Sequence, residues 1–114
     1  IKENHIAAAG GVPQVMQQAL TLKAGVEIQI EVETLDQLQQ ALDAGATSVL
    51  LDTLPLPRVR EAVALTAGRA LLEVFGGVTL ERLREIAATG VDRISIGGLT
   101  KHVRAVDFSM RVMD

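Results

Sequence analysis

Residues 28–52 have the sequence IQIEVETLDQLQQALDAGATSVLLD, and this stretch decides the fold. Its first six residues alternate between apolar and polar side chains, as in a β-strand with one buried face. Thr34 can cap a following helix, with Gln37 three residues later as in a capping box. Gly45 supplies the left-handed residue that ends many helices, and the apolar run to Asp52 predicts a second strand.

The same helix-to-strand unit recurs along the chain, because a glycine closes each predicted helix at nearly constant spacing: Gly25, Gly45, Gly68 and Gly90. We predict a helix over about 13–24, strands over 28–33, 47–52, 70–74 and 93–96 with helices between them, and a last β-like piece over 106–113. Thr79 is expected to cap the helix before the fourth strand. Strands that alternate with helices imply right-handed crossovers and a parallel sheet.

The two faces of the predicted strands differ in character. One face is wholly apolar: Ile28, Ile30, Val32, Val49, Leu51, Leu72, Val74, Ile94 and Ile96. The other face carries most of the polar groups, whereas an open doubly wound sheet would be apolar on both faces. The expected fold class is therefore α/β, a partial (β/α) barrel of parallel strands. At 114 residues the chain is short for a complete barrel of roughly 250 residues, and we expect a fragment of something longer.

The composition narrows the possible partners. The net charge of −3 argues against nucleic-acid and membrane-surface binders, which need a concentrated basic face. The absence of cysteine is consistent with the cytoplasm, and no apolar run approaches the length of a membrane span. We therefore expect a cytoplasmic protein with small-molecule substrates.

Acidic residues fall where the predicted strands end, which is where parallel α/β folds collect their catalytic groups. Glu31, Asp52 and Glu73 share one face of the sheet. Glu31 and Asp52 together could hold Mg²⁺, which takes one or two carboxylates plus substrate oxygens and water, or stabilise a developing cation. Lys2 would lie at the end of the first visible strand and point toward the same end of the barrel, where it could bind an anionic substrate or form an ion pair with Glu73.

Two glycine pairs follow the last two strands of the series. Gly76-Gly77 precedes the helix expected to begin at Thr79, and Gly97-Gly98 follows the strand over 93–96. Free backbone N–H groups in such turns attract anions, and many barrels bind phosphate after their last strands.

Together these residues resemble quinolinate phosphoribosyltransferase, also called the carboxylating nicotinate-nucleotide pyrophosphorylase. The resemblance runs over essentially the whole chain and is carried by Lys2-Glu3-Asn4-His5, Ile30-Glu31-Val32-Glu33 with Leu35-Asp36, Leu50-Leu51-Asp52, Leu72-Glu73-Val74 with Gly76, Thr89-Gly90-Val91-Asp92 with Ile94-Ser95, and Gly97 through Lys101.

The resemblance implies an enzyme that joins quinolinate to phosphoribosyl pyrophosphate with Mg²⁺, releasing pyrophosphate and CO2 to give nicotinate mononucleotide for NAD synthesis. It also implies that the chain is the C-terminal portion of a larger two-domain chain, and that the enzyme is a homodimer or higher homo-oligomer. Residues 1–104 would be the C-terminal part of the barrel domain, and residues 105–114 a terminal strand that returns to the N-terminal domain.

Site roles also follow from the resemblance. Lys2 would contact quinolinate or the ribosyl donor, while Glu31 and Asp52 would serve the ribose, Mg²⁺ and an oxocarbenium-like transition state. The expected substrate and phosphate contacts are Glu73, Phe75, Gly76, Gly77, Gly97, Gly98 and Lys101. The chain departs from the family in having Phe75 for the usual Ser, Thr53 for a common Asn and Gly98 for a common Ala.

Two other interpretations stay open at this point. One is another phosphate-binding barrel enzyme such as an isomerase or aldolase, although no strand interior offers a Schiff-base lysine or general base. The other is a catalytically incomplete piece that serves only as a folding or assembly module, since open barrel edges are prone to association.

Overall fold

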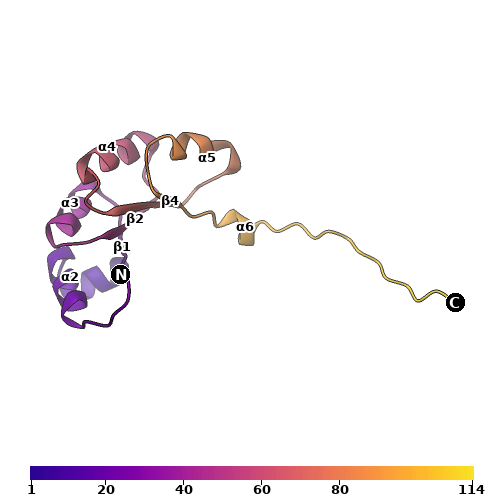
Figure 1. The fold of residues 1–114 in the computed structure, drawn as a ribbon, viewed down its shortest axis with the longest axis horizontal. Coiled ribbons are helices and arrows are strands. Elements are labelled where there is room, and N and C mark those ends of the chain that lie inside the picture. Colours follow the sequence, from indigo (N-terminus) through magenta and orange to yellow (C-terminus); the bar gives the residue numbers. More distant parts are fainter.

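The computed structural model describes residues 1–114, and it contains one parallel sheet with helices along its outer side (Figure 1). The strands follow one another in the order β1-β2-β3-β4: β1 Ile30–Val32, β2 Ser48–Asp52, β3 Leu71–Phe75 and β4 Arg93–Ile94. The helices are α1 Glu3–Ala9, α2 Val12–Thr21, α3 Leu35–Asp43, α4 Leu56–Thr66, α5 Leu80–Ala87 and α6 Gly98–Lys101. Sequential parallel strands with helical crossovers confirm the predicted α/β class.

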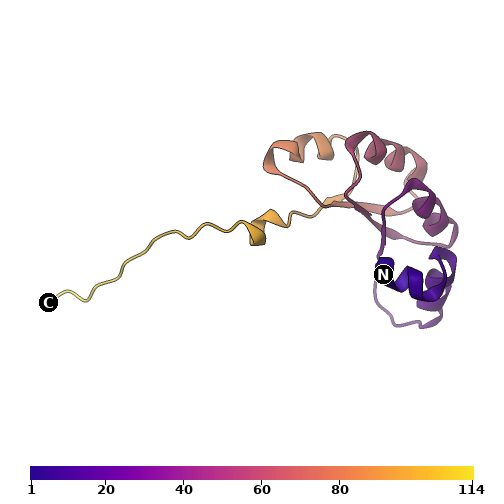
Figure 2. The ribbon, with the colours of Figure 1, turned by 180° about the vertical axis from the view of Figure 1, so that it is seen from behind.

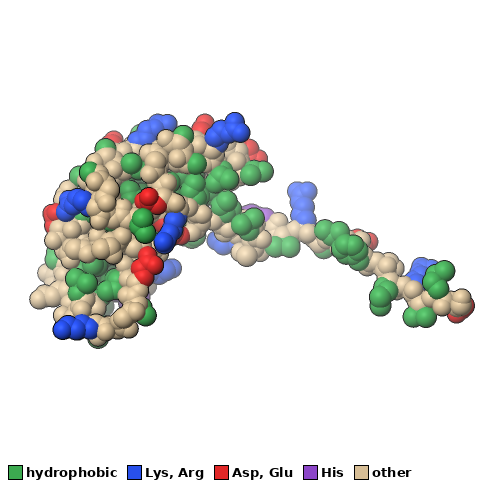
Figure 3. Space-filling model, in the orientation of Figure 1, with side chains coloured by type: hydrophobic (Ala, Val, Ile, Leu, Met, Phe, Trp, Pro, Cys, Tyr) green, Lys and Arg blue, Asp and Glu red, His purple; other side chains and the backbone are tan.

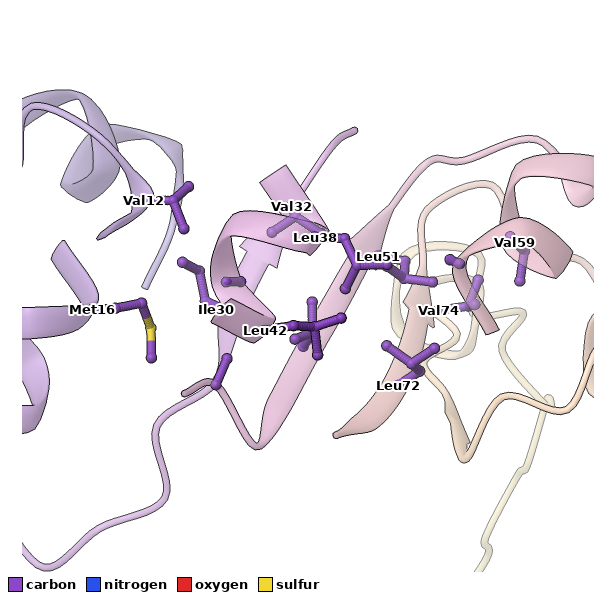
Figure 4. Close-up of a cluster of buried hydrophobic side chains, with 14 of the residues drawn as sticks. Val12, Met16, Ile30, Val32, Leu38, Leu42, Leu51, Val59, Leu72 and Val74 are labelled. Atoms are coloured by element: carbon purple, nitrogen blue, oxygen red, sulfur yellow. The ribbon is translucent and has the colours of Figure 1, made fainter. Parts of the chain in front are cut away.

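The apolar face of the strands forms the core, as the alternation predicted. Val32, Leu51 and Val74 lie in one row across the first three strands and are almost completely buried. Met16, Leu38, Leu42 and Val59 from the helices lie over this face (Figure 4). Burying each such side chain contributes about 1.5–3 kcal/mol, so this layer fixes the strand register and with it the opposite face.

The opposite face is concave and has no helices on it, as the view from behind also shows (Figure 2). Glu31 and Glu73 project from it, in the row that also contains Leu50. A curved parallel sheet with one helical layer is part of a barrel, with the concave face lining the interior. The partial barrel is therefore confirmed.

Two features at the start of the chain refine the sequence analysis. Ile1 donates its N–H to Gln29 and accepts from Glu31, at 2.7 and 2.9 Å, so it pairs alongside β1 and places Lys2 at a strand end as expected. Helix α1 was not predicted. Its N-cap is Lys2, whose N–H donates to His5 Nδ1, and its C-cap is Gly10, with a φ of 90°.

The observed helix ends and caps differ in places from the predicted ones. Helix α2 ends at Thr21, three residues before the predicted end, and Lys23 beyond it has a positive φ. Thr34 caps α3 as predicted, accepting from the N–H of Gln37. Thr79 occupies the N-cap position of α5, but its side chain makes no capping hydrogen bond, so that part of the prediction is wrong.

The C-terminal residues 103–114 are extended and exposed, and they leave the sheet as a tail (Figure 1). The strand expected over 106–113 does not form here, because a strand needs a hydrogen-bonded partner and the tail contacts no sheet edge. Apolar side chains stand out along the tail in Figure 3. The exposed apolar residues of this segment include Val106, Phe108, Met110 and Val112. Its return to a further domain stays a prediction. Nowhere in the structure is a helix both long and apolar enough to cross a membrane.

Candidate active site

The two acids singled out from the sequence lie on the same concave face of neighbouring strands. Glu31 on β1 pairs in register with Leu50 on β2, and Asp52 comes two residues later on the same face. From the ordinary strand spacing and rise, their Cα atoms are roughly 8 Å apart. We call this end of the concave face, where the strands end, the mouth.

Lys2 lies beside Glu31 at the mouth, with Nζ 3.8 Å from Oε2. The Glu31 side chain is only 10% exposed, whereas that of Lys2 is 68% exposed. The alternative pairing of Lys2 with Glu73 is wrong, because Lys2 lies beside β1 and Glu73 lies two strands away. An ion pair with one exposed partner is weak, so Lys2 remains available to a negatively charged ligand.

Glu73 lies at the centre of a hydrogen-bond network that spans the sheet. Its Oε2 accepts from Gln29 Nε2 at 2.9 Å, and its Oε1 accepts from the hydroxyl of Ser95. Gln29 Nε2 also donates to the buried Ser48 Oγ at 3.3 Å. Both carboxylate oxygens are therefore already engaged, which fits a structural role better than the predicted contact with phosphate.

These donors hold Glu73 in its charged form. The hydrogen bond from Ser95 lowers the pKa of Glu73 most, the bond from Gln29 and the charge of Arg93 lower it further, and partial burial opposes them. Because the folded pKa lies below its ordinary value of 4.5, this carboxylate stabilises the fold above that pH. The stabilisation is lost as the pH falls through the folded pKa.

We predict that Glu73→Gln weakens the dependence of the free energy of unfolding on pH. At neutral pH the variant should unfold at lower urea than the wild type, and the difference should shrink as the pH falls below 4.5. Urea midpoints measured from pH 7 down to pH 3 check this, with Glu85→Gln on the exposed side of α5 as the control. A difference that stays constant over this range would contradict the assigned network.

The two glycine turns line one cavity of about 230 Å³, which we call the glycine pocket. Its walls are Phe75, Gly76, Gly77, Val78, Thr79, Gly97, Gly98, Lys101 and His102. The turns expected to bind phosphate thus face a shared space, and Lys101 lies at it as predicted. Because the Thr79 side chain caps no backbone N–H of α5, the start of that helix keeps its donors for an anion.

Asp52 is connected to this pocket through Thr53 and Gly76. The hydroxyl of Thr53 donates to Asp52 Oδ1 at 2.8 Å, and the N–H of Thr53 donates to the carbonyl of Phe75 at 2.9 Å. Gly76 has a φ of 90°, and a Cβ added there would lie 2.3 Å from Thr53 Oγ1. The close approach requires glycine at this position.

The acids do not make a metal site on their own, because no group of three or more histidine, aspartate or glutamate side chains is placed to hold an ion. Mg²⁺ commonly binds through one or two carboxylates while substrate phosphates and water complete the octahedron. Glu31 and Asp52 suit that mode of binding.

The sequence analysis did not identify several polar groups of this region. Gln29 and Ser95 share the strand face of Glu73, and that parity was the available signal. His102 lines the glycine pocket beside Lys101, and no motif in the sequence pointed to it. The role of Thr53 depends on its left-handed backbone conformation, which neither periodicity nor residue type predicts.

Sequential parallel strands with helices on one face and acids near their carboxyl ends define part of an α/β barrel. A family model described as "Quinolinate phosphoribosyl transferase, C-terminal domain" matches residues 1–111. The chain belongs to this family.

Similar proteins agree with the assignment. The chain is 41% identical to the probable carboxylating nicotinate-nucleotide pyrophosphorylase of Bacillus subtilis, over 98% of this chain and 39% of that protein. It is 34% identical to a decarboxylating quinolinate phosphoribosyltransferase of Nicotiana tabacum, over 98% of this chain and 37% of that protein. The solved nicotinate-nucleotide pyrophosphorylase of Francisella tularensis superposes with a TM-score of 0.87 at 41% identity, over 94% of this chain and 38% of that one. The chain thus spans about two fifths of the length of these relatives.

Proposed function

We propose that the chain is the C-terminal part of an enzyme that transfers a phosphoribosyl group from phosphoribosyl pyrophosphate to quinolinate. The products are nicotinate mononucleotide, pyrophosphate and CO2. The observation that supports the proposal is the connection of Asp52, through Thr53, to the Gly76-Gly77 turn that lines the glycine pocket. The similar proteins named above, which cover nearly all of this chain, support the same reaction.

Each group at the mouth has a task in this reaction. The glycine pocket binds phosphate through backbone N–H groups, with Lys101 adding positive charge. Asp52 and Glu31 hold the ribose hydroxyls and stabilise positive charge as the bond from ribose C1 to the pyrophosphate oxygen breaks. The quinolinate nitrogen then forms its bond to C1. The carboxylate beside that nitrogen leaves as CO2, its bonding electron pair stays on the ring carbon, and that carbon takes up a proton from water. Lys2 attracts the dicarboxylate of quinolinate.

Mg²⁺ fits this arrangement as a shared ligand of protein and substrate. Glu31 and Asp52 would supply carboxylate oxygens, and the pyrophosphate would supply the rest with water. When bound, the ion neutralises the charge of the leaving pyrophosphate. The protein's own contribution is to keep both carboxylates on one face of the sheet, which the buried row of Val32, Leu51 and Val74 secures.

We further propose that the full-length enzyme acts as a homo-oligomer in the cytoplasm, and that the tail over 105–114 pairs with another part of it. The alternation of apolar and polar residues along the tail supports the pairing. Val106, Phe108, Met110 and Val112 would share one face of a strand, and they are now 73–95% exposed. Apolar side chains in that number are normally covered in a working protein.

The test of this function is an assay of pyrophosphate release by the full-length enzyme, with quinolinate or nicotinate as the acceptor. We predict turnover with quinolinate and little with nicotinate, because Lys2 and the mouth favour the dicarboxylate. We also predict that residues 1–114 alone have little or no activity, since this sheet is only part of a barrel. Turnover with nicotinate alone would overturn the substrate assignment, and full activity of the isolated chain would overturn the need for a further part.

A further inference from the structure

Thr53 has a backbone conformation that its residue type disfavours. It follows β2 directly and has a φ of 51°, in the left-handed region. A β-branched residue there is a genuine outlier, and such strain concentrates at functional sites where surrounding contacts maintain it. Lys23 and Ala67 also have positive φ values, of 47° and 48°, but both follow a helix, where a left-handed residue is common. Thr53 follows a strand instead.

The strained backbone turns the Thr53 side chain toward the mouth. In a continued strand, residue 53 would point to the opposite face from Asp52, which is the face covered by helices. The left-handed turn brings its hydroxyl within 2.8 Å of Asp52 Oδ1 instead. The N–H bond from Thr53 to the carbonyl of Phe75 on the next strand holds this conformation.

The same hydroxyl lies against the backbone of Gly76. A Cβ on Gly76 would lie 2.3 Å from Thr53 Oγ1, 3.1 Å from Asp52 Oδ1 and 3.2 Å from the backbone nitrogen of Thr53. One side chain therefore contacts both the carboxylate of the mouth and the first turn of the glycine pocket.

We propose that Thr53 is a positioning residue that orients the Asp52 carboxylate and keeps it in contact with the Gly76-Gly77 turn. The proposal rests on the proposed function, in which Asp52 serves the ribose. Because the Thr53 hydroxyl donates to Oδ1, the other carboxylate oxygen, Oδ2, is left for the ribose. The backbone strain is retained because an unstrained chain would point the hydroxyl away from Asp52.

The test compares three variants of the full-length enzyme with the wild type. Thr53→Ala removes the hydroxyl and should lower kcat/KM by roughly 10- to 100-fold, mainly through kcat, since a misplaced catalytic group costs about that much. Thr53→Ser keeps the hydroxyl and should stay within about threefold of the wild type. Ala67→Gly is the matched control, because it relieves a similar φ at the end of α4 and should leave the kinetics unchanged.

Two further readouts separate positioning from folding and from the choice of reaction. The thermal midpoint of Thr53→Ala should equal that of the wild type, since residue 53 is exposed. Crystal structures should show Asp52 Oδ1 on the residue 53 hydroxyl in the wild type and Thr53→Ser, and more than one Asp52 orientation in Thr53→Ala.

Wild-type kinetics for Thr53→Ala, or an equal loss in Thr53→Ser, would overturn the proposal. If the wild type fails to use quinolinate, the proposed function fails instead, and the Asp52 orientations in the crystal structures still decide the role of Thr53. In that case, a single Asp52 orientation in Thr53→Ala, unchanged from the wild type, would overturn the positioning role of Thr53.

Discussion

Asp52→Asn in the full-length enzyme will lower kcat by roughly 10²- to 10³-fold, the usual effect of removing one electrostatic stabiliser of a transition state. The substitution keeps the shape of the side chain and an oxygen for the Thr53 hydroxyl, while it removes the charge that faces the developing ribosyl cation. Glu31→Gln should act in the same direction, because that carboxylate is mostly shielded from water beside Lys2. Steady-state rates of pyrophosphate release measure both effects.

The stability of these variants distinguishes a catalytic loss from a folding defect. Neither carboxylate is part of the buried core, so the urea midpoints of Asp52→Asn and Glu31→Gln should stay close to that of the wild type. Asp43→Asn on the outer helix α3 is the matched control, since it loses only an exposed pair with Arg69 and should keep full activity. Wild-type rates in both site variants would mean that these acids have no part in catalysis.

Gly76→Ala should damage both binding and turnover. At a φ of 90° any side chain is strained, and the new Cβ would also press on Thr53 Oγ1, Asp52 Oδ1 and the backbone nitrogen of Thr53. The strand end that carries Asp52 must then shift. We expect a loss of roughly 10²-fold in kcat/KM for phosphoribosyl pyrophosphate and about 1–2 kcal/mol of stability.

Gly25→Ala is the control for the backbone strain alone. Its φ is 69°, and a Cβ at that position would meet nothing within 4 Å. This control should lose a similar amount of stability and none of the activity. If Gly76→Ala loses only stability, the contact between Gly76 and Thr53 has no role in the reaction.

Strand alternation was enough to predict the main layers of the fold. The parity of residues 28–33 and 47–52 assigned the buried and concave faces correctly, because a strand beneath a helix layer can tolerate no charge on that side. The common location of the two glycine turns was also predictable, since parallel strands end at the same edge.

The remaining features depend on local contacts that periodicity does not encode. Helix α1 has only seven residues, too few for a periodic signal, and its N-cap is a lysine rather than a typical capping residue. The strand over 106–113 needs a partner that the sheet does not supply. The partner of Lys2 was misjudged because Lys2 lies beside β1 and Glu73 lies two strands away, a placement that depends on how separate segments pair.

The central claim is that the acids of β1 and β2 and the glycine pocket act on one ligand. A crystal structure of the full-length enzyme with phosphoribosyl pyrophosphate and Mg²⁺ tests it most directly. We predict a phosphate of the ligand on the backbone N–H groups of Gly76, Gly77 and Gly98, and the ribose within hydrogen-bond distance of Asp52. A ligand bound elsewhere, with the glycine pocket empty and Asp52 facing only water, would contradict the account.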